Sequence, residues 1–260
     1  MPNDEGERQR MDIHYHSLRL AMRNVLFCAP IEHPTSVIDV GTGTGIWALD
    51  MADAYPGASV LGIDLSPTQP SWVAPNLEFQ LFDLEETWDM PLRFDFVHCR
   101  EMNGFSIKDW PKYFEQAYTS MKAGGWIECQ EFDLNVISDD HTIPEDSWVI
   151  RWQNLWEQGV QQAGMTGRCY PDKMADQMRE AGFININIVP FKMPIGPWPK
   201  DPVLRQSGLL TLVGLLEGIA GLSMRVYTKF LGWSVQEMDI LLAKVRTEWK
   251  NKKMHTYFPV

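Results

Sequence analysis

The stretch VIDVGTGTGIW, residues 37–47, decides the fold of this chain. A short apolar strand runs into glycines at every second position, Gly41, Gly43 and Gly45, and a helical pattern begins directly after them. Glycines between a strand and a helix let the backbone approach a ligand closely and leave helix N–H groups free. A dinucleotide fingerprint needs its third glycine where this chain has Ile46, so the spacing does not favour a nicotinamide or flavin cofactor.

Strands and helices alternate on both sides of this stretch. The predicted strands are 36–40, 59–65, 77–83, 94–100, 126–132, 186–194 and 255–260. The predicted helices are 3–28, 46–56, 110–125, 145–164, 171–183, 203–231 and 234–253. Such an order predicts an α/β fold with a parallel sheet, right-handed crossovers and a mostly helical cap between the last two strands.

Composition and charge narrow the class of protein. The chain has 260 residues, 45% of them hydrophobic and 22% charged, which is typical of a globular protein. A net charge of −11 argues against a nucleic-acid partner. The stretch 207–224 is apolar, but Glu217 interrupts it, which favours a buried or pocket-lining helix over a membrane span. The polar N-terminus and four cysteines without C-x-x-C spacing favour a reducing compartment, cytoplasm or nucleus, and no metal site.

Carboxylates accompany the ends of the first three predicted strands. Asp39 precedes the first glycine by two residues, Asp64 ends the second strand, and Asp83 ends the third. One such acid alone is as easily a surface residue that caps a turn. Three of them beside a glycine loop indicate a ligand-binding edge of the sheet.

These residues resemble the first motifs of class I methyltransferases, which use S-adenosylmethionine. Further segments are similar to a large fungal family of secondary-metabolism methyltransferases that includes the LaeA-type regulators. The matching segments are PNDEGERQRMD (2–12), GTGTGIWALDMAD (41–53), GIDLSPTQP (62–70), FDFVHCR (94–100), AGGWIECQE (123–131), PIGPWPKD (194–201), LGWS (231–234) and HTY (255–257).

The resemblance implies a fold and a cofactor site. The fold is Rossmann-like, a mostly parallel seven-stranded sheet with an antiparallel last strand, an N-terminal helix and a helical cap inserted before that strand. It forms a single domain over 1–260: a helix in 1–30 over the cofactor site, a cofactor-binding core at 36–133, and cap elements at 145–165 and 200–253. The cofactor-binding residues implied are Asp39, Gly41, Gly43, Gly45, Asp64, Leu65, Asp83, Leu84 and Arg100.

Methyl transfer to an alcohol or phenol gains from a general base. His98 and Glu131 lie at the ends of predicted strands, where each is a candidate base or else a satisfied core residue or a loop cap. Arg100 is a candidate for the cofactor carboxylate or for a surface ion pair. In this family the closing strand starts on the rim of the strand ends, so His255 is the third candidate base.

Trp148, Trp152 and Trp156 repeat every four residues on one predicted helix. Such a stripe is either core or a flat wall for an aromatic acceptor. The first functional hypothesis is methyl transfer to a small molecule, on oxygen of a fungal secondary metabolite. The alternatives are a cofactor-binding subunit of a velvet-type transcriptional complex and a methyltransferase scaffold recruited for another reaction. We expect a small-molecule acceptor, no nucleic acid and no membrane, with a homodimer or a velvet-type protein as the alternative partners.

Overall fold

The computed structural model describes residues 4–90, 93–104 and 106–260. Their contacts divide the chain into two compact units. The sheet unit contains residues 25–131 and 170–189, and the helical unit contains the residues up to 24 together with 132–169 and 190–260. The single domain expected over 1–260 stays a prediction.

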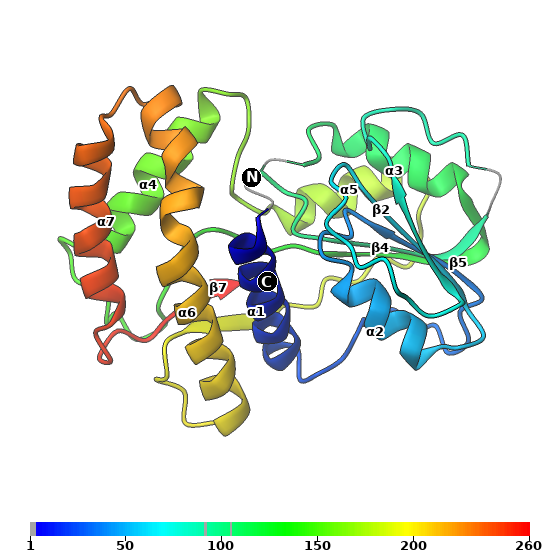
Figure 1. Cartoon of the computed structure of the whole chain (residues 1–260), viewed down its shortest axis with the longest axis horizontal. Helices are drawn as coiled ribbons and strands as arrows, with labels where there is room; N and C mark the ends of the chain where they lie inside the picture. The colour runs from blue at the N-terminus through cyan, green and yellow to red at the C-terminus, as the bar shows by residue number, and fades with distance from the viewer. Residues whose placement is uncertain (1–3, 91–92, 105) are drawn as a thin grey trace. The chain divides into compact units, whose positions relative to one another are not determined.

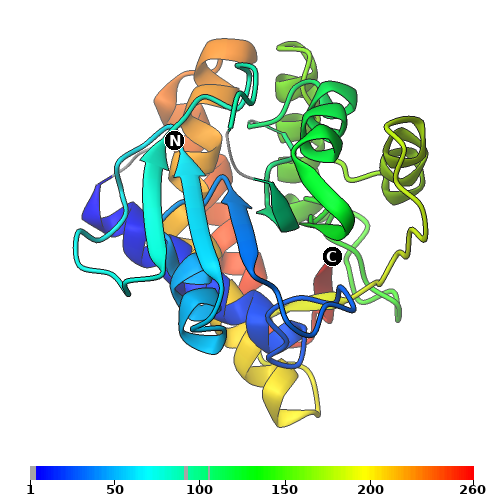
Figure 2. The same ribbon diagram turned by 90° about the vertical axis from the view of Figure 1, so that its right-hand side faces the viewer.

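A parallel sheet forms the centre of the sheet unit. Its strands lie in the order β3-β2-β1-β4-β5, and the arrows of β1, β2 and β3 point the same way in Figure 2. The strands are β1 Ser36–Val40, β2 Ser59–Asp64, β3 Leu77–Leu81, β4 Phe94–Arg100 and β5 Met121–Gln130. Every pair within the sheet is parallel. The carboxyl ends of all five strands therefore meet at one edge, which is where this class of fold binds ligands.

Helices cover both faces of this sheet. Helix α2, Ile46–Ala54, lies on one face, and α3, Trp110–Thr119, and α5, Pro171–Glu180, lie on the other (Figure 1). Helix α3 begins where the Asp109 side chain accepts a hydrogen bond from the Lys112 N–H, which satisfies one of the free donors of the first turn.

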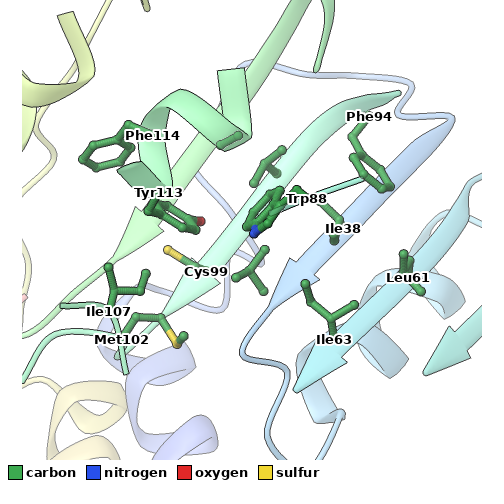
Figure 3. Close-up of a cluster of buried hydrophobic side chains, with 13 residues drawn as sticks. Ile38, Leu61, Ile63, Trp88, Phe94, Cys99, Met102, Ile107, Tyr113 and Phe114 are labelled. Carbon is green, nitrogen blue, oxygen red and sulfur yellow. The ribbon is translucent and has the colours of Figure 1, made fainter. Parts of the chain in front are cut away.

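The core of the sheet unit is built from the apolar strands and the helices above them (Figure 3). Ile38, Phe94 and Cys99 come from the sheet, and Tyr113 and Phe114 come from α3. Strands β1 and β4 are buried along nearly their whole length, as expected for central parallel strands with helices on both faces. This core fixes the strand ends that carry the predicted site.

The parallel sheet confirms the Rossmann-like α/β fold, with one difference in its last strands. Strands β6, Lys192–Ile195, and β7, Thr256–Pro259, pair with each other, antiparallel, as a separate sheet. The parallel sheet of the described residues thus has five strands, against seven predicted in one sheet. The strand predicted over 186–194 begins only at Lys192. Phe191 still exchanges two backbone hydrogen bonds with Val260, but residues 186–190 have no ladder partner among the described residues.

The described residues of the helical unit form five helical segments. They are α1 Glu5–Ala21, α4 Trp148–Gln161, α6 Pro202–Arg225, a π-helical turn η1 Val226–Phe230, and α7 Val235–Trp249. Helix α1 ends earlier than the predicted 28, because Arg23 and Asn24 adopt positive φ values of 58° and 64°. A chain in that conformation cannot continue a right-handed helix.

Helix α6 and the turn η1, residues 202–230, are together long and apolar enough to cross a membrane by length and composition. In the helical unit this helix packs along α1. Ser17 of α1 donates to the Ser207 carbonyl (2.9 Å), and the hydroxyls of Ser17 and Thr211 lie 2.6 Å apart. These buried polar contacts show that one face of α6 packs against α1.

Candidate functional site

The glycine loop between β1 and α2 has the backbone that its sequence demands. Gly41, Gly43 and Gly45 have φ values of +71°, +58° and +83°, a region that residues with a Cβ avoid. A Cβ on Gly41 would lie 2.3 Å from Met102 Sδ, and one on Gly45 would lie 2.4 Å from the Phe79 ring. The loop therefore allows close backbone approach, and Gly45, the N-cap of α2, brings no capping side chain.

Asp64, at the end of β2, is bonded to this loop. The Gly43 N–H donates to one carboxylate oxygen and the Ser66 N–H to the other, both at 2.9 Å. Burial raises the pKa of Asp64, although these two hydrogen bonds act in the opposite direction. Asp64, which the resemblance implies as a cofactor-binding residue, thus also sets the position of the glycine loop.

The loop after β2 reaches back to the same glycine. Thr68 Oγ1 and Gln69 Nε2 both donate to the Gly43 carbonyl, at 2.7 and 2.6 Å. Leu65, predicted to contact the cofactor, is 66% exposed at the start of this loop. The sequence reasoning missed Thr68 and Gln69, although both lie in the quoted segment GIDLSPTQP, because only the folded chain shows their contacts with Gly43.

Asp39, at the edge of the glycine loop, is enclosed by protein. It is 3% exposed, accepts a hydrogen bond from Thr42 Oγ1 (2.6 Å), and lies 2.7 Å from His98 Nδ1. His98 is fully buried, with its ring stacked on Trp47 at a centroid distance of 3.6 Å. A ring in this position has no access to an acceptor, so the geometry favours a core histidine held by Asp39 over the base, although its Nε2 has no hydrogen-bond partner among the described residues.

Asp83 and Leu84, which the resemblance implies as cofactor-binding residues, lie just after the end of β3. The Asp83 carboxylate accepts a hydrogen bond from the Glu85 N–H at 3.0 Å, as in a turn. Leu84 is half-buried and lines a small pocket with Ile107, Tyr113 and the polar side chains around them.

Arg100 and Glu131 lie at the ends of β4 and β5. The Arg100 guanidinium donates through Nε and Nη2 to Gln130 Oε1, at 2.9 and 2.6 Å. Glu131 is 6% exposed and accepts hydrogen bonds from the N–H groups of Met102 (2.9 Å) and Asn103 (3.1 Å). Burial raises the pKa of Glu131 to about 8. The geometry places Glu131 as the residue that holds the loop after β4, beside its predicted role as a base.

His255, in the helical unit, is paired with an acid. Its Nδ1 lies 2.5 Å from an Asp140 carboxylate oxygen, and its ring stacks on Trp198 at 5.3 Å. The hydrogen bond from His255 holds the pKa of Asp140 well below the usual range. The Thr142 hydroxyl accepts the His255 N–H at 2.8 Å. Asp140 was not predicted, because nothing in the segment SDDHT marks which acid meets a residue 115 positions later.

The tryptophan stripe of α4 is core for two of its members. Trp152 is fully buried, and its Nε1 donates to the Ser223 hydroxyl at 2.9 Å. Trp156 is also buried, and its Nε1 donates to the Leu222 carbonyl at 3.0 Å. Trp148 is half-buried, with Lys244 Nζ 3.7 Å from its ring centroid. A wall for an aromatic acceptor is therefore not favoured at Trp152 and Trp156.

Known proteins are similar to this chain in sequence and in fold. Residues 11–188 match the model of a family described as a methyltransferase domain, which is more than half of the chain. The chain belongs to this methyltransferase family. Membership confirms the predicted enzyme class, a methyltransferase, and the predicted methyl donor of the class, S-adenosylmethionine. The backbone fits this donor, because the loop after β1 needs glycine at Gly41 and Gly45.

Individual relatives cover nearly all of the chain. The methyltransferase pytC of Aspergillus terreus is 40% identical over 259 residues, which are 99% of this chain and 79% of that protein. The secondary metabolism regulator LAE1 of Cochliobolus heterostrophus is 36% identical over 98% of this chain and 85% of its own length. These matches confirm the predicted resemblance to fungal LaeA-type methyltransferases.

Among solved structures, a phosphoethanolamine N-methyltransferase of Haemonchus contortus, in complex with phosphomonomethylethanolamine and S-adenosylhomocysteine, has a TM-score of 0.50. Its identity is 17%, and the match covers 94% of this chain and 51% of that one. At this identity the likeness supports the fold alone.

Proposed function

We propose that this protein transfers the methyl group of S-adenosylmethionine to an oxygen atom of a small molecule of fungal secondary metabolism. The observation that carries the proposal is the glycine loop, whose glycines have positive φ values and whose Gly41 and Gly45 pack closely against Met102 and Phe79. Asp64 lies beside this loop and is bonded to it. The relative named methyltransferase pytC supports methyl transfer as the activity.

When bound, S-adenosylmethionine supplies a reactive methyl group on a positively charged sulfur, so the donor carries most of the chemistry. The residues of the chain bind and orient it, and orientation alone contributes about 7–11 kcal/mol in well-aligned reactions. Asp64, at the end of β2, and the glycine loop bonded to it are the residues that we propose hold the donor. Arg100, Leu65 and Asp83 stay predicted ligands of the donor.

We propose His255 as the base that takes a proton from the acceptor. A carboxylate can only accept a hydrogen bond, so Asp140 fixes the Nδ1–H tautomer of the imidazole. The second ring nitrogen then has a free lone pair, which is the form that a general base needs. Stacking on Trp198 holds the plane of the ring.

A calorimetric titration with S-adenosylmethionine and S-adenosylhomocysteine tests the donor part of the proposal. We expect micromolar binding of both. A panel of phenols, alcohols and amines with donor labelled in its methyl group then tests the acceptor atom. Label found only in products of the oxygen acceptors supports oxygen transfer. Label found only in the amines would refute it.

A regulatory role is the second candidate, favoured by relatives named secondary metabolism regulators, at 36% identity in Cochliobolus heterostrophus and 32% in Aspergillus fumigatus. On this view the chain binds the donor within a velvet-type complex and has no small acceptor. A stable complex with a purified velvet-type protein, without label transfer to any acceptor, would favour it. Donor binding without either result would favour a scaffold recruited for another reaction.

A further inference from the structure

We propose that His98 is a positioning residue that sets the affinity for the methyl donor through Asp39 and Thr42. These three residues, called here the relay, connect the middle of β4 to the glycine loop. The inference rests on the proposed binding of S-adenosylmethionine at that loop. It assigns to Asp39 an indirect role, because the protein itself encloses its carboxylate.

The contacts of the relay use both oxygens of one carboxylate. His98 Nδ1 lies 2.7 Å from Asp39 Oδ1, and Thr42 Oγ1 donates to Asp39 Oδ2 at 2.6 Å. Since the carboxylate can only accept, the proton of the His98 ring is on Nδ1. Asp39 and His98 are also direct neighbours across the parallel pair β1–β4. The side chain of Asp39 is therefore fixed from both sides.

The His98 ring is fixed in orientation as well. It is stacked on the Trp47 indole with an angle of 3° between the planes. The indole is held in turn by a hydrogen bond from Nε1 to the Leu26 carbonyl at 3.0 Å. Trp47 is the second residue of α2, which begins where the glycine loop ends. Strand β4, the loop and the start of α2 thus meet at one imidazole.

The relay ends at Thr42, next to the loop residue that is bonded to Asp64 of β2. The N–H of Thr42 donates to the Ile63 carbonyl (2.9 Å), and the next residue, Gly43, donates to Asp64. A shift of Thr42 would therefore displace Gly43 from Asp64. Burying a carboxylate is unfavourable by several kcal/mol unless it is well hydrogen-bonded. The Asp39 carboxylate is buried and hydrogen-bonded on both oxygens, and its role in the relay is to hold the glycine loop.

Two isosteric pairs of variants test the relay by titration with S-adenosylmethionine. His98→Phe keeps an aromatic ring beside Trp47 but removes the N–H that donates to Asp39. Thr42→Val keeps the shape of the side chain but removes the hydroxyl. We expect each variant to bind S-adenosylmethionine about tenfold more weakly, which is the loss for one hydrogen bond to a charged group. Thr42→Ser and His98→Asn retain a donor at the same place, and we expect their affinity within about threefold of wild type.

A neighbouring variant separates positioning from mere loss of stability. Val97→Ala removes a fully buried side chain one residue earlier in β4. It should lower the melting temperature and leave the donor affinity within about twofold, because Val97 lies in the apolar core and not in the relay.

The double variant His98→Phe/Thr42→Val completes the cycle. Both changes break one relay, so we expect the pair to bind the donor no more weakly than the worse single variant. Fully additive losses, wild-type affinity in either single variant, or an equal loss in Val97→Ala would overturn the inference. A wild-type chain that binds no donor would instead refute the proposed function on which it rests.

Discussion

Replacing Glu131 with glutamine should remove a strong pH dependence of stability. Glu131 is buried, and its carboxylate accepts hydrogen bonds from the N–H groups of Met102 and Asn103. Burial raises the pKa of Glu131 from 4.5 to about 8 against the effect of those two bonds, and the charge of Glu101 adds to the rise. The folded protein therefore favours the neutral carboxyl.

The sign and size follow from linkage. Between pH 4.5 and about 8 the folded state holds a proton that the unfolded chain has released, so the free energy of unfolding falls as the pH rises through this window. Each pH unit contributes about 1.4 kcal/mol. Glu131 should thus remove about 3–5 kcal/mol from the stability between pH 4.5 and 8. Glutamine has no proton to lose, so the stability of Glu131→Gln relative to wild type should rise by about 3–5 kcal/mol between pH 4.5 and 8.

Urea unfolding at pH 5 and pH 8.5 measures this effect as the difference between variant and wild type. The control is Asp95→Asn, another carboxyl-to-amide change at backbone N–H donors. For Asp95 burial alone would raise the pKa, but the hydrogen bonds from Thr35 and Ser36 outweigh it and hold the pKa low. Its pKa lies below the window, so Asp95→Asn should change stability equally at both pH values. A Glu131→Gln difference that is also equal at both values would refute the reasoning.

Other changes have simpler readouts. Gly45→Ala should lower the free energy of unfolding by about 1–3 kcal/mol, because alanine would adopt φ +83° with its Cβ against Phe79. Gly57→Ala, where a Cβ meets nothing within 4 Å, is its control in the same urea assay. Asp64→Ala should weaken donor binding by about 1.5–3 kcal/mol by calorimetry, and unchanged affinity would remove Asp64 from the site. His255→Ala should reduce turnover at least tenfold with donor affinity unchanged, and equal turnover would exclude it as the base.

Local sequence patterns predicted the sheet well and its pairing less well. Strands β1 and β4 begin and end at the predicted residues, because each is an apolar run bounded by turn residues. The segment at 186–194 alternates in the same way, yet only its last residues pair. An alternating pattern shows which residues suit a strand but not which neighbour they will find. The π-helical turn at Val226–Phe230 is equally invisible within a continuous helical pattern.

The residues of the site also fall into two groups, those that local motifs predicted and those that contacts between distant residues decided. The glycines, Asp64 and Asp83 could be predicted, because their roles follow from a short motif and from their places at strand ends. The enclosure of Asp39 by His98 and Thr42 could not, since it depends on a cross-strand neighbour. Glu131 was placed at the right strand end, but its backbone partners Met102 and Asn103 come from a loop 29 and 28 residues earlier. Contacts of that range are decided by the fold.

The packing of α1 against α6 has a consequence for folding during translation. Ser17 finds its partners Ser207 and Thr211 only 190 residues or more later in the sequence. At about 5–20 residues per second, a ribosome needs roughly 10–40 s to supply them. The first helix thus emerges long before its partner, whereas all five strands of the parallel sheet lie before residue 131. During synthesis α1 is a nascent segment with an apolar face and no docking partner in its own unit, a natural target for a chaperone.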